Sequence, residues 1–357
     1  MTRPIAAIIN TKNIQHNLNV IRNLVFPSKI WSVLKANAYG HGINNIWKSL
    51  ILTDGFAVLN LSEAIFLRKK YHNKPILLLE GFFNINDLYL IYKYNLTITI
   101  HSNWQLDILI NYQPKYPINI YIKINTGMNR LGFKINNIHN IIYIIKKKIN
   151  IKNIAFLAHF ADCSKHSHYL FQELNIIKKT IDHYTYTRSF ANSAAILWHE
   201  FMHYDWVRCG ILLYGASPTS KWEDIKNLSI KPVMTLQSKI IGIQKLMPGE
   251  TVGYNHQYCT NKKRRIGIIA CGYGDGYPKN ISNNTSILIH GTITKILGTV
   301  TMDMIAVDLF NIPTAKIGTK VELWGDNIKI DNIAQSANTI SYELMCAISS
   351  RVPRIIK

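Results

Sequence analysis

The sequence predicts an α/β protein with an N-terminal (β/α)8 barrel and a C-terminal mostly-β domain, and three observations lead there. Up to about residue 215 the chain repeats one unit, in which a short apolar strand ends at a polar residue and a helix-like segment follows. Eight such units fit the length of a closed barrel, with an open doubly wound sheet as the alternative. From about residue 230, strand-like pieces alternate with Gly, Pro and Asn turns.

The eight predicted barrel strands are apolar and rich in β-formers, as expected for strands covered on both faces. They span 30–34, 56–59, 76–79, 97–100, 118–124, 154–158, 189–191 and 206–207. Helical spacing of apolar residues follows in 61–70, 85–94, 103–110, 136–148 and 169–183. Parallel barrels gather their chemistry at the carboxyl ends of the strands. The polar residues predicted for that rim are Lys35, Asn60, Glu80, His101, Lys123, His159, Asn192 and Arg208.

The change of pattern divides the chain into a barrel over 1–225 and a mostly-β domain over 226–357, with the boundary inside the polar stretch 218–231. The predicted strands of the second domain are 233–243, 265–271, 287–289, 293–297, 304–309 and 320–323. Helical spacing returns only at 331–337 and 341–349.

Composition excludes several classes of protein. A hydrophobic content of 48% is typical of a globular protein, and no apolar run approaches the ~20 residues that span a bilayer. The five cysteines are scattered and form no C-x-x-C pair, so we expect reduced thiols without a disulfide framework or metal site. The short apolar start is not a secretory signal, which predicts a cytoplasmic protein without a membrane partner.

The net charge of +21 raises the alternative of nucleic-acid binding. However, the excess of lysine runs along the whole chain and accompanies abundant Ile, Asn and Tyr, a bias that AT-rich coding would produce. Neither of the basic runs 146–148 and 262–265 lies in a recognisable nucleic-acid-binding motif. Solvated surfaces explain both runs more simply, so we predict no nucleic-acid partner.

The stretch from Val33 to Gly42, VLKANAYGHG, places Lys35 where a buried strand gives way to a polar turn. By position alone, an ordinary lysine at the end of a strand is the simpler interpretation. As a set, however, these ten residues resemble the signature around the cofactor lysine of alanine racemases. The resemblance implies that Lys35 forms a Schiff base with pyridoxal 5'-phosphate.

A second block, KINTGMNRLG over 123–132, is similar to another segment of that family. The resemblance implies that Arg130 binds the phenolic oxygen of the cofactor and contributes to substrate binding. It also implies that Lys123 supports this arginine and is a candidate for carbamylation. Asn125 and Asn129 stand where the family pattern has Asp and Gly.

The turn after the eighth strand offers the backbone amides of Gly210 and Ile211, with the Ser193 hydroxyl on the neighbouring strand end. Barrels often bind phosphate at this place, although a turn kinked by glycine is the plainer alternative. With the lysine motif, the cofactor's phosphate is the better interpretation. The resemblance adds Tyr39 and Tyr342 to the phosphate site.

Three further residues at the strand ends match the family, namely His159 in its HFA triplet, Asn192 beside Ser193, and Arg208. The resemblance implies that His159 flanks the cofactor ring and that Arg208 faces the pyridine nitrogen. A guanidinium can only donate there, which discourages ring protonation and makes the ring a poorer electron sink. This favours racemisation over other reactions of the cofactor.

Racemisation needs two proton-transfer groups on opposite faces of the substrate carbon. Lys35 serves one face, and the segment TVGY ending at Tyr254 resembles the family segment that bears the opposing tyrosine. Taken alone, Tyr254 is one of 19 tyrosines, and core packing would be the default. In the same family, residues matching Tyr273, Met302 and Asp303 lie at the substrate site.

The resemblance runs from Lys35 to Arg354 and implies an alanine racemase that interconverts L- and D-alanine and supplies D-alanine for peptidoglycan. It also implies a homodimer in which the second domain completes the partner's site. A broad-specificity amino-acid racemase is the close alternative. A non-catalytic barrel that binds pyridoxal phosphate would leave Tyr254 unexplained, and a decarboxylase of basic amino acids would favour a carboxylate where Arg208 stands.

Overall fold

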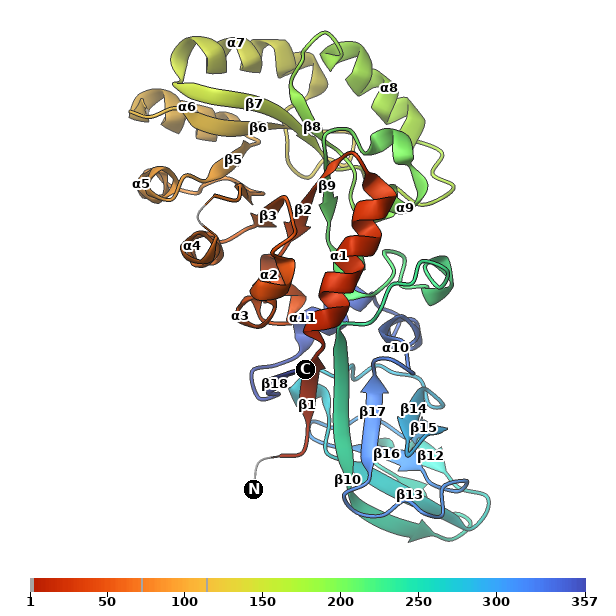
Figure 1. The fold of residues 1–357 in the computed structure, drawn as a ribbon. Coiled ribbons are helices and arrows are strands. Elements are labelled where there is room, and N and C mark those ends of the chain that lie inside the picture. Colours follow the sequence, from red (N-terminus) through yellow and green to blue (C-terminus); the bar gives the residue numbers. More distant parts are fainter. Residues whose placement is uncertain (1–2, 72, 114) are drawn as a thin grey trace. The chain divides into compact units, whose positions relative to one another are not determined.

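The computed structural model describes residues 3–71, 73–113 and 115–357. These residues form two compact units, each of which draws on more than one stretch of the chain (Figure 1). The barrel unit consists of Ile21–Ala38 and Leu50–Gly210, and the β-rich unit consists of the chain up to Val20, Tyr39–Ser49 and Ile211–Lys357.

The barrel unit contains a parallel sheet of eight strands in the order β8-β7-β6-β5-β4-β3-β2-β9. The backbone amide of Arg208 in β9 donates to the Ala191 carbonyl just beyond β8 at 2.8 Å, which links the two ends of this order. All eight predicted strands are present, so the barrel prediction is confirmed. Their bounds are β2 Lys29–Val33, β3 Gly55–Val58, β4 Ile76–Leu78, β5 Thr97–Ile100, β6 Ile118–Ile124, β7 Ile151–Ala158, β8 Thr187–Ser189 and β9 Trp206–Cys209.

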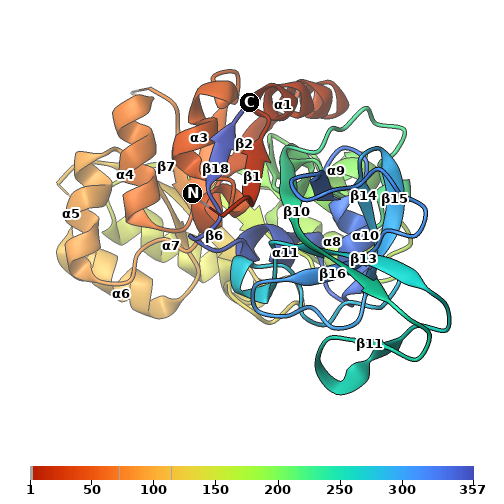
Figure 2. The same ribbon diagram turned by 90° about the horizontal axis from the view of Figure 1, so that it is seen from below.

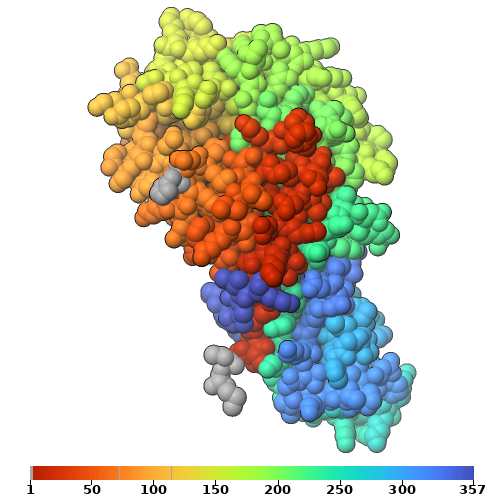
Figure 3. All heavy atoms as spheres, in the orientation of Figure 1, coloured from red at the N-terminus to blue at the C-terminus, as the bar shows by residue number. Residues whose placement is uncertain are grey.

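Helices cover the outside of this sheet and form the orange-to-green surface in Figure 3. Figure 2 shows α4, α5, α6 and α7 side by side along the sheet. Their inner residues are apolar and buried, for example Ile141 and Ile145 in α7. The helices are α4 Leu61–Lys70, α5 Ile85–Lys93, α6 Asn103–Tyr112, α7 Ile138–Lys148, α8 Leu170–Ile181 and α9 Ser193–Trp198.

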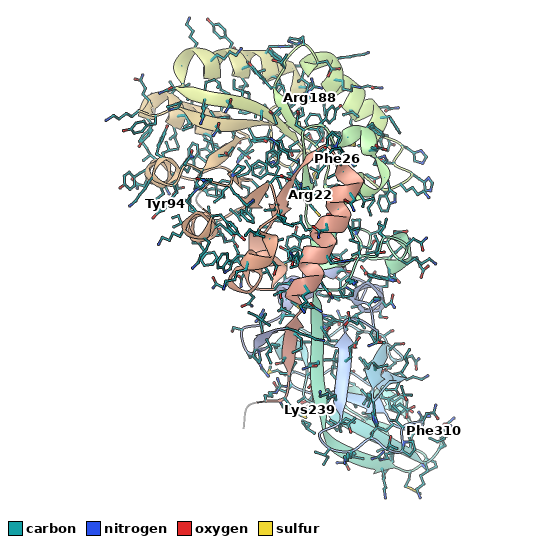
Figure 4. All side chains as sticks on the ribbon, viewed as in Figure 1. Arg22, Phe26, Tyr94, Arg188, Lys239 and Phe310 are labelled. Carbon is teal, nitrogen blue, oxygen red and sulfur yellow. The ribbon has the colours of Figure 1, made fainter. Side chains whose placement is uncertain are left out.

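The β-rich unit is built on a mainly antiparallel sheet in the order β13-β16-β15-β14-β17-β10-β1-β18. The long strand β10, which carries the labelled Lys239 in Figure 4, also pairs with β13, so the sheet curls back on itself. Its strands are β1 Ala6–Ile9, β10 Met234–Leu246, β13 Arg264–Ile269, β14 Ser286–Ile289, β15 Thr292–Leu297, β16 Ile305–Asp308, β17 Lys320–Trp324 and β18 Arg354–Ile356. Helices of this unit include α3 Ile43–Ile46, α10 Ile330–Ser336 and α11 Ser341–Ala347.

Several elements were not predicted from the sequence, among them β18, α9 and those that follow here. Strand β1 lies between β10 and β18, and helix α1, Thr11–Val25, follows it directly. A small hairpin joins β11, Thr251–Val252, to β12, Tyr258–Cys259. Strand β1 and the hairpin strands carry too few residues to show a period, whereas α1 has 15 residues and buries Ile14, Leu18, Ile21 and Val25 at helical spacing, a pattern that the sequence reasoning overlooked. Within the described ranges, no helix is both long enough and apolar enough to cross a membrane.

Candidate active site

Lys35 follows β2 directly and begins an unusual left-handed turn, α2 (Lys35–Tyr39). Ala36, Asn37, Ala38 and Tyr39 have φ values of 53°, 51°, 55° and 49°. This conformation costs a non-glycine residue about 1–2 kcal/mol. The Glu63 carboxylate accepts the Asn37 amide at 2.9 Å and so holds the turn. Strain of this kind is concentrated at functional sites, and here it fixes the backbone beside Lys35.

Four cationic side chains meet at the carboxyl ends of the barrel strands. Burial, followed by the positive charges of Arg208 and Arg130, lowers the pKa of Lys123 in β6 to about 8. Lys35 lowers it further, whereas Glu80 opposes the shift. The barrel rim is therefore strongly electropositive, an environment that favours an anionic ligand.

Arg208 is buried in β9 and is held by neutral acceptors. Its guanidinium donates to the Ala158 carbonyl at 2.6 Å, the Ser189 hydroxyl at 3.1 Å and the Phe190 carbonyl at 3.3 Å. Burial lowers its pKa to about 10, so the group stays cationic at neutral pH. Its Nη2 lies 3.5 Å from Nδ1 of His159. Because arginine can only donate, this contact places the imidazole proton on Nε2 of His159.

His159 is kept neutral by its surroundings. Burial, with the positive charges of Arg208 and Arg130, lowers its pKa to about 3. In the unfolded chain, the His159 imidazole takes up a proton below the ordinary histidine pKa of about 6.5, whereas in the folded chain it stays neutral. The folded state therefore loses stability as pH falls from there towards the folded pKa.

This linkage predicts an effect on the free energy of unfolding of the cofactor-free protein. When the pH is lowered from 7 to 5, the free energy of unfolding of the wild type should fall by about 2 kcal/mol more than that of His159→Gln. Urea unfolding at the two pH values measures the difference. His166→Gln, at an exposed histidine of the same unit, serves as the control and should behave as the wild type does. Equal losses in wild type and His159→Gln would contradict the neutral buried imidazole.

Arg130 is exposed and extends from the loop after β6, which Asn125 organises. The Asn125 side-chain oxygen accepts the amides of Gly127 and Asn129, both at 3.1 Å, and its amide group donates to Asn129 at 3.0 Å. Asn129 has φ 55°, a conformation that asparagine tolerates. The two departures from the family pattern thus form one local hydrogen-bonded turn.

The predicted phosphate residues of the barrel unit lie together at the last two strand ends. The Ser193 hydroxyl is buried and accepts the Gly210 amide at 3.1 Å. Asn192 precedes α9, and its side-chain oxygen accepts the Ala195 amide at 3.0 Å. Asn192 is therefore a helix cap in this structure, and that role shapes the turn that carries Ser193.

The other predicted phosphate residues belong to the β-rich unit. The Tyr39 ring stacks on Tyr214 at a centroid distance of 4.6 Å and packs against Tyr342 at 5.9 Å. Ile211 is fully buried at the start of a short 3-10 turn, Ile211–Tyr214. The structure thus brings Tyr39 and Tyr342 together from positions about 300 residues apart in the chain.

Tyr254 lies in the turn between β11 and β12, and 70% of its surface is exposed. The next two residues, Asn255 and His256, have φ values of 59° and 51°. The His256 ring contacts the Thr251 hydroxyl at 2.6 Å and closes the turn. The hairpin therefore presents Tyr254 outward, contrary to the core packing that would be the default for a tyrosine.

Two neighbouring turns of the β-rich unit carry the predicted substrate residues. Tyr273 begins the 3-10 turn Tyr273–Asp275 and is 40% exposed, while Met302 is 52% exposed. Asp303 forms an ion pair with Arg351 at 2.5 Å. The surroundings of Asp303 lower its pKa, chiefly through the hydrogen bond from Arg351.

Sequence reasoning missed Gln105, which is fully buried in α6. Its side chain accepts the His101 amide at 2.9 Å and donates to the carbonyls of Glu80 and Phe82 at 3.0 and 3.2 Å. It therefore ties together the loops after β4 and β5. No period or motif marks this role, because glutamine at the start of a helix is ordinary.

In the part of the chain that the structure describes, no group of three His, Cys, Asp or Glu side chains could hold a metal ion. The electropositive rim fits an anionic organic group better. A closed parallel barrel has a lysine, arginines and a neutral histidine at the carboxyl ends of its strands, where barrel enzymes carry their active sites. Joined in one chain to a β domain, it defines a two-domain barrel enzyme.

Comparison with known proteins identifies the family. The model of "Alanine racemase, N-terminal domain" matches residues 9–218, and that of "Alanine racemase, C-terminal domain" matches residues 233–356. The chain belongs to the alanine racemase family. It is 48% identical over 353 residues to an alanine racemase of Erwinia tasmaniensis, with 99% of both chains covered. A catabolic alanine racemase of Salmonella typhimurium shows the same identity and coverage.

Solved structures agree with this assignment. The biosynthetic alanine racemase of Pseudomonas aeruginosa matches with a TM-score of 0.96 and 34% identity, over 100% of both chains. An alanine racemase from Acinetobacter baumannii matches with a TM-score of 0.93 and 36% identity, again over 100% of both chains.

Proposed function

We propose that the protein interconverts L-alanine and D-alanine with pyridoxal 5'-phosphate as its cofactor, and that Lys35 and Tyr254 are the two proton-transfer groups. The observation that carries the proposal is the cationic rim, where Lys35 lies near Lys123, Arg130 and Arg208. The family assignment and the names of the relatives support alanine as the substrate.

The residues present fit this cofactor, which carries a phosphate and a phenolic oxygen. The buried Ser193 hydroxyl and the Gly210 amide would hold the phosphate, together with Ile211, Tyr39 and Tyr342. Arg130 would bind the phenolic oxygen. When bound, pyridoxal phosphate supplies an electron-withdrawing ring that stabilises negative charge on the substrate carbon.

Three side chains would set the behaviour of the cofactor ring. Arg208 is held by carbonyl and hydroxyl acceptors and would direct a remaining donor to the ring nitrogen, which keeps that nitrogen unprotonated. His159, neutral and bonded to Arg208, would flank the ring. Asn192 would contribute to the cofactor site by capping α9 and so holding the turn that carries Ser193. With the cofactor bound, this arrangement would limit the negative charge that the ring accepts and would favour return of the proton to the substrate carbon.

Lys35 and Tyr254 would divide the proton transfers between the two faces of the substrate. The Lys35 amine holds or releases a proton on one face, and the Tyr254 hydroxyl does so on the other. Tyr273, Met302 and Asp303 would contact the substrate. With these roles, each enantiomer meets a base on the face from which its hydrogen must leave.

Lys123 would support Arg130, and we propose that it is carbamylated. Its pKa of about 8 leaves part of the amine neutral near neutral pH, and the neutral amine is the form that reacts with carbon dioxide. Protein in 13C-labelled bicarbonate should show a carbamate resonance that Lys123→Arg lacks and that Lys152→Arg, at an exposed lysine of the neighbouring strand, retains. A resonance that survives in Lys123→Arg would remove the modification from this residue.

The test of the function is a chiral assay. Purified protein with pyridoxal phosphate is incubated with a panel of L-amino acids, and the D-enantiomers are quantified. D-alanine should exceed every other product. Comparable D-serine and other enantiomers would instead indicate a broad-specificity racemase, and the absence of D-alanine would overturn the proposal. Two relatives of the Salmonella genus are named catabolic, so supply of D-alanine to peptidoglycan, and the cytoplasmic location, stay predictions.

We further propose that the active form is a homodimer in which the β-rich domain completes the partner's site. The exposed Tyr254 supports this, because an isolated chain would not otherwise leave a catalytic tyrosine 70% exposed. Analytical ultracentrifugation at assay concentration should show a dimer, and activity should fall on dilution below its dissociation constant. An active monomer would disprove the shared site.

A further inference from the structure

Two turns of the β-rich unit, 272–275 and 301–304, are joined through their backbones. The amides of Tyr273 and Gly274 donate to the carbonyls of Thr301 and Met302 at 3.0 and 2.9 Å. A Cβ atom on Gly272 would lie 2.3 Å from both of these carbonyl oxygens, so only glycine permits this approach. The two turns therefore form one structural piece, which we call the paired turns.

The carboxylate of Asp275 lies at the base of the paired turns and is fully buried. One oxygen, Oδ1, accepts from Arg3 at 2.5 Å and from Arg351 at 3.0 Å. The other, Oδ2, accepts the Gly272 amide at 2.9 Å. A buried carboxylate is stable only when it is paired and hydrogen-bonded, and Asp275 satisfies both conditions.

Both arginines also reach the second turn. Arg351 donates to the Asp303 carboxylate at 2.5 Å, and Arg3 donates to the Asp303 backbone carbonyl. Each guanidinium thus bridges Asp275 in one turn and Asp303 in the other. Arg3 precedes β1 and Arg351 precedes β18, so two neighbouring strands from opposite ends of the chain hold the same loops.

The side chains that leave the paired turns are exposed, whereas the base is buried. Tyr273 is 40% and Met302 is 52% exposed, against 0% for the Asp275 side chain. We infer that Arg3 and Arg351 are positioning residues for substrate binding, because they bridge Asp275 and Asp303 and so fix the turns from which Tyr273 and Met302 contact alanine. This inference rests on the proposed function.

The test compares KM and kcat for alanine in Arg3→Gln and Arg351→Gln. Loosening the paired turns weakens contacts made equally in the ground state and the transition state, so KM should rise about tenfold while kcat changes less than about threefold. Arg351→Lys keeps the charge and one donor, and should restore part of the lost affinity. A fall in kcat with KM unchanged would overturn the inference.

Arg264→Gln provides the matched control. Arg264 pairs with Asp308 in the same unit, as Arg351 pairs with Asp275 and Asp303, and lies near Phe310, which Figure 4 labels. Its side chain is 14% exposed, against 32% for Arg3 and 40% for Arg351. It starts β13, at the opposite end of that strand from the paired turns. This variant should leave KM unchanged, and a KM as high as that of Arg351→Gln would show a general loss of stability and overturn the positioning role.

Hydrogen exchange of the substrate-free protein gives a second readout that does not depend on activity. The amides of 273–274 should exchange at least about tenfold faster in Arg3→Gln and Arg351→Gln than in wild type, and at the wild-type rate in Arg264→Gln. If the amides of 273–274 are as well protected in the two arginine variants as in the wild type, Arg3 and Arg351 do not hold the paired turns. If the wild type racemises no alanine, the proposed function fails, but the exchange rates still decide whether the arginines hold the turns.

Discussion

Lys35→Ala is expected to abolish racemisation, with a loss in kcat of roughly 10³-fold or more, since the change removes both the covalent attachment point and one proton-transfer group. The absorbance band of the lysine-bound cofactor should disappear as well. Visible absorption of protein reconstituted with pyridoxal phosphate, together with the chiral assay, measures both effects.

The control for this change is Lys29→Ala, at the exposed first residue of the same strand, β2. Lys29 stands over the Trp206 ring at 5.6 Å, away from the carboxyl end that bears Lys35. Its variant should keep both the band and the activity. Persistence of the band in Lys35→Ala would remove Lys35 from its proposed role.

Tyr254→Phe is expected to act unequally on the two enantiomers. Exchange of the Cα hydrogen with solvent deuterium should fall roughly 10²-fold or more for the enantiomer that Tyr254 serves, and by less than about tenfold for the other. The asymmetry arises because Lys35 still removes the hydrogen on its own face. Mass spectrometry of L-alanine and D-alanine incubated separately in deuterium oxide measures the two rates.

Tyr258→Phe offers a matched control from the same hairpin. Tyr258 packs its ring on a small apolar cluster that includes Val252 and Ile266, so loss of its hydroxyl leaves the hairpin intact. Both exchange rates should remain near those of the wild type. Equal losses for the two enantiomers in Tyr254→Phe would argue against bases on opposite faces.

The barrel was predictable because its strands are buried on both faces and its helices on one. Strands such as Ile118–Ile124 and helices such as Ile138–Lys148 carry these patterns over enough residues to be recognised. Strand β1 was missed for the opposite reason. Its four residues, Ala6–Ile9, fit several structures, and their place is decided by β10 and β18, more than 200 residues away.

The candidate site was predictable where a residue type is tied to chemistry within a local motif. Lys35, Lys123, His159 and Arg208 lie at the carboxyl ends of strands. The structure places them close enough that the positive charges of Lys35 and Arg208 lower the pKa values of Lys123 and His159. The left-handed conformation of 36–39 was not foreseen, since alanine and tyrosine rarely adopt it.

Supporting contacts were harder to foresee than the site itself. Asn192 was assigned from the resemblance to the cofactor, yet its side chain caps α9. The arginines that hold Asp275 come from opposite ends of the chain, so no local pattern connects them. Contacts of this kind depend on sheet order, which the sequence alone left open for the second domain.

The place of β1 in its sheet also bears on synthesis of the protein. β1 pairs on one side with β10 and on the other with β18, the last strand of the chain (Figure 1). During translation, β1 therefore waits on the order of ten seconds for β10, at typical elongation rates, and longer for β18. The nascent chain can close its barrel strands before this sheet exists, and the β-rich unit is completed only after β18 has left the ribosome.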